Sequence, residues 1–69
     1  MKVGALVRLE DSGYSHLHVA SSIDNEKFEL DEIPCGSIAI VTDVTRKSAI
    51  QVMLDGKIRY INPAQCVEI

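Results

Sequence analysis

The hydrophobic positions of this chain recur at every second residue over most of its length, which is the period of β-strands. The clearest case is the segment 38–44, whose residues are mostly β-branched, a class enriched in strands. Turn-forming residues such as Asp11-Ser12-Gly13 and Pro34-Cys35-Gly36-Ser37 separate the alternating segments. The pattern therefore predicts an all-β chain of five short strands, which cover residues 3–10, 38–44, 49–54, 57–61 and 66–69.

The connections between these strands differ in how clearly they can be interpreted. The long excursion from Tyr14 to Ile33 has apolar residues at 28 and 30, a spacing that favours two extended arms. A short helix over Asn25 to Ile33 is the competing interpretation, because Glu, Lys and Leu are good helix formers. The segment Asn62-Pro63-Ala64-Gln65 predicts a 3₁₀ turn, because Pro63 has no N–H to donate within a sheet.

The hairpin at Asp55-Gly56 allows two registers. A two-residue loop pairs Leu54 with Lys57 and mixes charged and apolar side chains on each face. A three-residue loop with Gly56 in the left-handed conformation separates the faces, so we expect this register. Its inner face would carry Ile50, Val52, Ile58 and Tyr60, and its outer face Gln51, Met53, Lys57 and Arg59. The predicted core then includes Val7, Ala39, Val41, Val52, Ile58, Tyr60 and Val67.

Length and composition fit one small globular domain over residues 1–69, with a mass of 7.6 kDa. The chain has no Trp and one Phe, so its core must be aliphatic. A net charge of −3 argues against a broad electrostatic surface for nucleic acid, although a local basic patch remains compatible with it.

Cysteine content and the first residues bear on where the chain works. Cys35 and Cys66 are too few for the disulfide framework of a small secreted domain, so we expect free thiols in a reducing compartment. Arg8 interrupts the first apolar stretch, which therefore lacks the uncharged core of a signal peptide. The expectation is a cytoplasmic protein without a membrane segment.

The order of strands, long excursion, tight turns and 3₁₀ break resembles an SH3-like β-barrel, partly open and made of five short strands. The run from Gly36 to Val44 resembles the core of KOW and related Tudor-like modules. Together with the segment 55–63, it also resembles small uncharacterised SH3-like proteins of tailed phages, which implies a host cytoplasm or a virion as the location. The signature of peptide-binding SH3 domains is not met, because there is no Trp pair beside Tyr14 and Tyr60.

Candidate chemistry is sparse. His16 and His18 share one face of an extended segment, but a structural zinc site needs four ligands and neither cysteine has a nearby partner. Carboxylates concentrate between Asp24 and Glu32, either as an acidic lip for a basic partner or as a solvated loop. No triad order and no phosphate-binding glycine loop is present, so we expect no enzyme and no cofactor.

Two functions remain after these exclusions. The leading hypothesis is a protein-interaction module with a protein partner of unknown identity. The alternative is a KOW-like nucleic-acid binder that acts through a basic cluster of Arg46, Lys47, Lys57 and Arg59. Outward Leu6, Met53 and Ile61 also predict a small homo-oligomer, with Phe28 and Leu30 covered by a second chain. The residues that could contact a partner are Tyr14, His16, His18, Phe28, Arg46, Lys47, Lys57 and Arg59.

Overall fold

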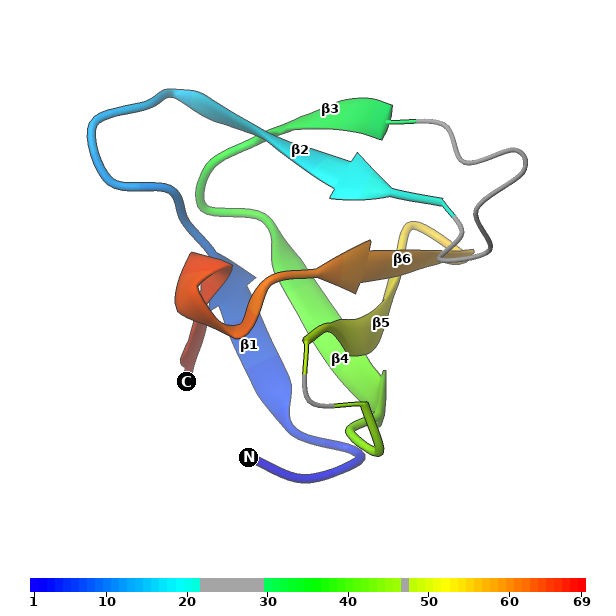
Figure 1. Cartoon of the computed structure of the whole chain (residues 1–69). Coiled ribbons are helices and arrows are strands. Elements are labelled where there is room, and N and C mark those ends of the chain that lie inside the picture. The colour runs from blue at the N-terminus through cyan, green and yellow to red at the C-terminus, as the bar shows by residue number, and fades with distance from the viewer. Residues whose placement is uncertain (22–29, 47) are drawn as a thin grey trace.

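The structure, a computed structural model, describes residues 1–21, 30–46 and 48–69, which form seven strands and one 3₁₀ turn without an α-helix. All the strand pairs are antiparallel, and the sheet has the order β3-β2-β6-β5-β4-β1-β7 without closing on itself (Figure 1). The all-β prediction is therefore confirmed. In chain order, the elements are β1 (Leu6–Leu9), β2 (His16–Ala20), β3 (Leu30–Pro34), β4 (Ile38–Asp43), β5 (Ile50–Leu54), β6 (Lys57–Ile61), η1 (Pro63–Gln65) and β7 (Cys66–Glu68).

The strand count exceeds the expected five because the arms of the long excursion also pair as strands. β2 and β3 run antiparallel from His16 opposite Pro34 to Ala20 opposite Leu30. Ala20 also pairs with Tyr60 of β6, which joins the arms to the rest of the sheet. The extended arms are thus confirmed over residues 16–20 and 30–33, and a helix over 25–33 is wrong for residues 30–33. Residues 22–29 lie outside the described residues.

The predicted 3₁₀ turn before the last strand is confirmed as η1. Asn62 caps it, because its Oδ1 accepts a hydrogen bond from the Ala64 amide at 2.9 Å. The Asn62 amide in turn donates to Gln65 Oε1 at 3.2 Å, which completes a reciprocal cap. The turn delivers β7 to its position beside β1, where Leu9 lies opposite Cys66.

The hairpin between β5 and β6 corrects the predicted register. It has the two-residue loop, with Leu54 opposite Lys57 and Val52 opposite Arg59. Asp55 and Gly56 both have positive φ, 52° and 76°, as a type I′ turn requires. This turn matches the right-handed twist of the flanking strands, and it moves every β6 side chain to the face opposite the predicted one.

Packing within the described residues follows from that register. Val7, Ala39, Val41 and Val52 are buried as predicted. Ile58 and Tyr60 are only partly buried, and Val67 is 45% exposed, because it lies opposite the outward Arg8. Ile61, expected outside, is 2% exposed. The core consists of Val7, Leu9, Leu17, Val19, Ala39, Val41, Ile50, Val52 and Ile61.

Candidate functional site

A row of apolar side chains crosses the outer face of the sheet. Leu6 of β1 lies opposite Ile40 of β4, Ile40 opposite Met53 of β5, and Met53 opposite Ile58 of β6. Leu6, Ile40 and Met53 are 47%, 46% and 43% exposed, and Ile58 is half-buried. The outward positions predicted for Leu6 and Met53 are confirmed, and the register joins them into one row.

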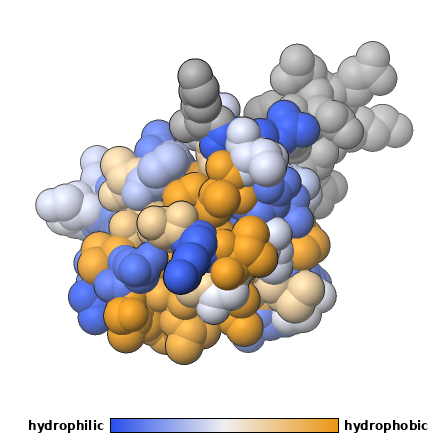
Figure 2. Space-filling view, turned by 90° about the horizontal axis from the view of Figure 1, so that it is seen from below, coloured by the Kyte–Doolittle hydropathy of each residue, from blue (hydrophilic) through white to orange (hydrophobic). Residues whose placement is uncertain are grey.

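A second, shorter row lies beside the first. Arg8 has Ile38 on one side and Val67 on the other, and both apolar side chains are almost half exposed. We call the two rows together the outer apolar patch. Its apolar residues are Leu6, Ile38, Ile40, Met53, Ile58 and Val67, and Arg8 lies within it between Ile38 and Val67. Figure 2 shows exposed apolar side chains gathered on one side of the molecule, interrupted by a few charged ones. Contiguous apolar surface of this kind marks interaction sites more often than scattered exposed residues do.

The charge within the patch has a partner in the same chain. Arg8 Nε donates to Glu10 Oε1 at 2.8 Å, and both side chains are about half exposed. A protein that covers the patch would therefore contact an Arg8 side chain whose charge is already neutralised by Glu10. Sequence reasoning missed the patch as a whole, because it depends on the pairing of strands far apart in the chain.

The structure does not gather the predicted basic cluster. Arg59 was expected on an outward face, but it shares the face of buried Val52, and its guanidinium lies 2.5 Å from Asp31 Oδ2 of β3. Its side chain is only 14% exposed. Arg46 is exposed in the connection before β5, whereas Lys57 is exposed at the start of β6. Lys47 lies outside the described residues.

Tyr60 also departs from its predicted place. Its position opposite Gln51 puts it on the outer face, not in the core. There it lines a shallow hollow together with Asp43, Arg46, Ala49 and Gln51. Tyr60 and Arg46 therefore line the same hollow, at the end of the sheet where β4 leads into its loop.

The two histidines point outward from β2. His18 Nε2 lies 3.6 Å from Glu32 Oε2 across the strand pair, and His16 Nδ1 lies 3.0 Å from Ser15 Oγ. Among residues 1–21, 30–46 and 48–69, no group of three or more histidine, cysteine or carboxylate side chains is placed to hold a metal ion. Of the predicted acidic run, Asp31 and Glu32 are described, and each faces a basic side chain.

A cleft of about 400 Å³ opens where the β1–β2 connection, the β3–β4 turn and η1 converge. Tyr14 stands at this cleft with its side chain 69% exposed. Glu10 already binds Arg8, and Asp11 accepts a hydrogen bond from Gln65 Nε2 at 3.4 Å. The lining residues are Glu10, Asp11, Ser12, Tyr14, Cys35, Ala64 and Val67. Phe28, the remaining candidate contact residue, lies outside the described residues.

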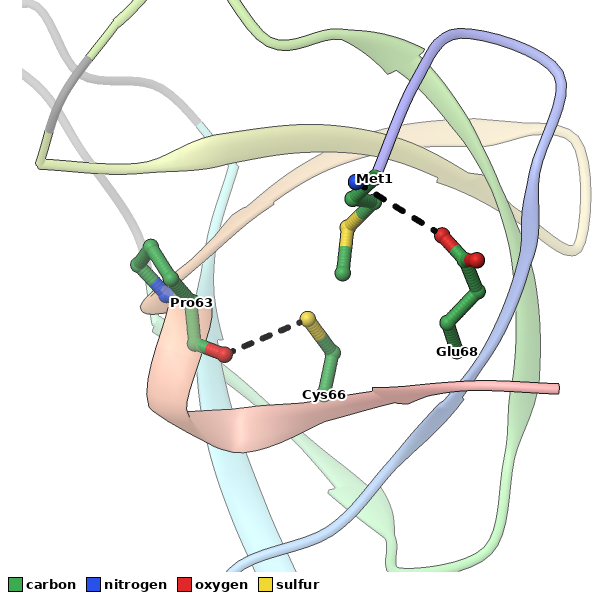
Figure 3. A network of polar contacts seen from close by, with 4 residues as sticks. All are labelled: Met1, Pro63, Cys66 and Glu68. Carbon is green, nitrogen blue, oxygen red and sulfur yellow. Dashed lines mark hydrogen bonds and ion pairs between the residues drawn. The ribbon is translucent and has the colours of Figure 1, made fainter.

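Both thiols are free, and the environment of Cys66 makes it a poor nucleophile. Burial raises the pKa of the Cys66 thiol, which favours its protonated form. Its Sγ–H donates to the carbonyl of Pro63 at 3.4 Å, close to the ion pair of the Met1 amino group with Glu68 at 3.8 Å (Figure 3). Cys66 and Glu68 both belong to β7, so these two contacts help to hold that strand in place.

Comparison with known proteins adds no family: no family model, curated protein or solved structure matches the chain. The part of the chain that the structure describes contains no helix of the length and apolarity that a membrane crossing requires.

Proposed function

We propose that this chain is a small protein-interaction module without catalytic activity, built on an SH3-like, partly open barrel. The order of its elements supports the fold: a first strand, an excursion of two paired arms, a strand after a tight turn, a hairpin, a 3₁₀ turn and a final strand. The SH3-like proteins of tailed phages that the sequence resembles suggest a phage particle or a phage-modified host complex as its setting, in the host cytoplasm or the virion.

One observation carries the function: the outer apolar patch extends over neighbouring strands of a chain with few core residues. Leu6, Ile40 and Met53 stay nearly half exposed although they lie directly opposite one another. Leaving them in water costs free energy that burial against a partner would recover, at about 25 cal/mol for each Å² of apolar surface. A polar outer face would serve a solitary domain of this size better.

Retention of proteins on the immobilised chain tests the proposal. We expect wild-type chain to retain a protein, either another copy or a different one, that the Ile40→Lys variant loses. Leu30→Lys is the matched control, because Leu30 is 58% exposed and lies on edge strand β3, away from the patch. Calorimetry on the purified retained protein should reproduce the ranking of the variants. Equal retention by all three chains, or none by any, would contradict the proposal.

The alternative is a nucleic-acid module, and the outward Tyr60 beside Arg46 favours it. An exposed ring stacks on bases, and a nearby guanidinium contacts phosphate. Against it, Arg59 is engaged by Asp31 and the net charge is −3. A mobility-shift titration at low salt separates the two: we expect no shift of single-stranded RNA or DNA up to about 50 µM protein. A salt-sensitive shift that Arg46→Glu abolishes would favour the nucleic-acid module instead.

A further inference from the structure

We infer that the partner on the outer apolar patch is a second copy of this chain, packed face to face in a symmetric dimer. The inference rests on the proposed function, because it assigns the occupant of the same surface. A two-fold interface places the patch against the same patch of the second copy, so the side chains of the patch must be compatible with one another. The row of Leu6, Ile40, Met53 and Ile58 meets this condition, because it contains no charge and no hydrogen-bonding group.

The charges around the row allow a second copy, which carries the same net charge, to approach. Arg8, the charged residue within the patch, is bound by Glu10 at 2.8 Å, so two copies bring together neutral pairs. The described carboxylates of β3, Asp31 and Glu32, stand at the far edge of the sheet and face Arg59 and His18. Repulsion between these two carboxylates and their copies is therefore kept away from the contact.

The backbone under the row has the regularity that sheet-on-sheet packing requires. The pairings of Leu6 with Ile40, Ile40 with Met53 and Met53 with Ile58 continue without a break. The irregularity of β4 falls beyond Val41, outside the row. Two such faces pack about 10 Å apart with their strands nearly aligned, and their side chains interdigitate.

The small area of the patch indicates that the dimer is weak. Neighbouring strands lie about 4.8 Å apart and outward residues on one strand about 7 Å apart, so the two rows, with Arg8 included, cover roughly 240 Å² of the sheet. A stable interface buries about 800 Å² on each partner, and weak complexes bury less. The patch is thus at the lower end, and the dimer should dissociate on dilution.

Sedimentation velocity on the purified chain, from about 10 µM to about 1 mM, tests this dimer. We expect the mass to rise from 7.6 kDa toward twice that value as concentration increases. Met53→Lys should weaken the association at least about tenfold, because a lysine would be buried without a partner. Ile40→Thr should weaken it less while keeping a β-branched residue in the strand. Leu30→Lys, with the same change of charge outside the patch, should dimerise like wild type.

Three results would overturn the inference that a second copy occupies the outer apolar patch. A mass of 7.6 kDa at all concentrations, with a different protein retained through the patch, would refute the dimer but leave the interaction module standing. The same constant mass without any patch-dependent retention would refute both. A dimer that Leu30→Lys dissolves while Met53→Lys and Ile40→Thr leave it intact would move the interface to the excursion. Circular dichroism and unfolding midpoints establish that each variant is folded.

Discussion

On β4 the exposed side chains are larger than the buried ones, which is the reverse of the usual arrangement. Its core-side residues, Ala39 and Val41, are small and buried, whereas its outward residues, Ile38 and Ile40, are larger and 47% and 46% exposed. The concave side of a small curled sheet (Figure 1) has little room, and close packing there requires modest side chains. Apolar character alone therefore does not identify the core face in this protein; what each face packs against does.

Truncating one side chain on each face of the sheet tests most directly which face is the core face. Val52→Ala should lower the free energy of unfolding by about 1–3 kcal/mol, because Val52 is fully buried and its loss leaves a cavity. Ile40→Ala removes more atoms but should cost less in dilute solution, where the outer face meets water. Urea unfolding at micromolar concentration measures both. If Ile40→Ala proved the more damaging substitution, the assignment of the two faces would be wrong.

The hairpin turn decides which residues reach each face, so it gives the next prediction. Gly56→Val should cost about 1–2 kcal/mol, since a β-branched residue resists the φ of 76° at this position. A Cβ there would meet nothing within 4 Å, so the loss comes from backbone strain and not from a clash. Gly56→Asn is the control and should cost less, because asparagine tolerates the left-handed region. Equal losses in thermal unfolding would argue against the two-residue turn.

The failure of the predicted hairpin register has a physical cause. The parity argument placed Arg59 outside, because a charge next to Val52 looked unfavourable. The compensating carboxylate of Asp31 comes from β3, and local alternation in residues 50–61 contains no information about that strand. Once Arg59 turned inward, Tyr60 had to turn outward and Ile61 inward, so a single long-range contact accounts for all three errors.

Other features needed only local sequence, and those were predicted correctly. The alternation at 38–44 identified Ala39 and Val41 as core residues. The segment Asn62-Pro63-Ala64-Gln65 specified the 3₁₀ turn through proline and capping chemistry. For the candidate site, Leu6 and Met53 were recognised as outward residues. Their union in one row through Ile40 required the pairing of β1, β4 and β5, which no local pattern encodes.

The ion pair behind that error offers a sharper test of the inner face. Arg59→Met should lower stability by about 1–2 kcal/mol, a value between those of exposed and fully buried pairs, because Asp31 is left unpaired. In a double-mutant cycle, Asp31→Asn should lose most of its effect once Arg59 is already methionine. Lys57→Met, an exposed neighbour on the same strand, is the control and should change little. An additive cycle would mean that the pair does not hold β3 against β6.

The smallest expected effect is a pH dependence at Asp43, where β4 ends. Chiefly the backbone N–H of Thr45, which donates to Asp43 Oδ1 at 2.9 Å, lowers the pKa of this carboxyl from its usual 3.8. A carboxyl whose pKa is lower in the folded state stabilises the fold fully above its unfolded pKa, and this contribution disappears as pH falls through the folded pKa. Asp43 keeps part of its surface in contact with water, which screens the charge, so the effect should be slight.

The matched variant for this carboxyl is Asp43→Asn, which keeps the shape and removes the charge. Wild type should unfold at a slightly higher temperature than the variant at pH 7, and the difference should vanish as the pH falls below 3.8. A difference that persists or grows in acid would contradict the proposed hydrogen bond. Dimerisation should not share this pH dependence, because the side chains of Leu6, Ile40 and Met53 do not titrate. Replacing Asp43 should therefore leave the sedimentation behaviour at pH 7 unchanged, which separates the loop at the end of β4 from the apolar row.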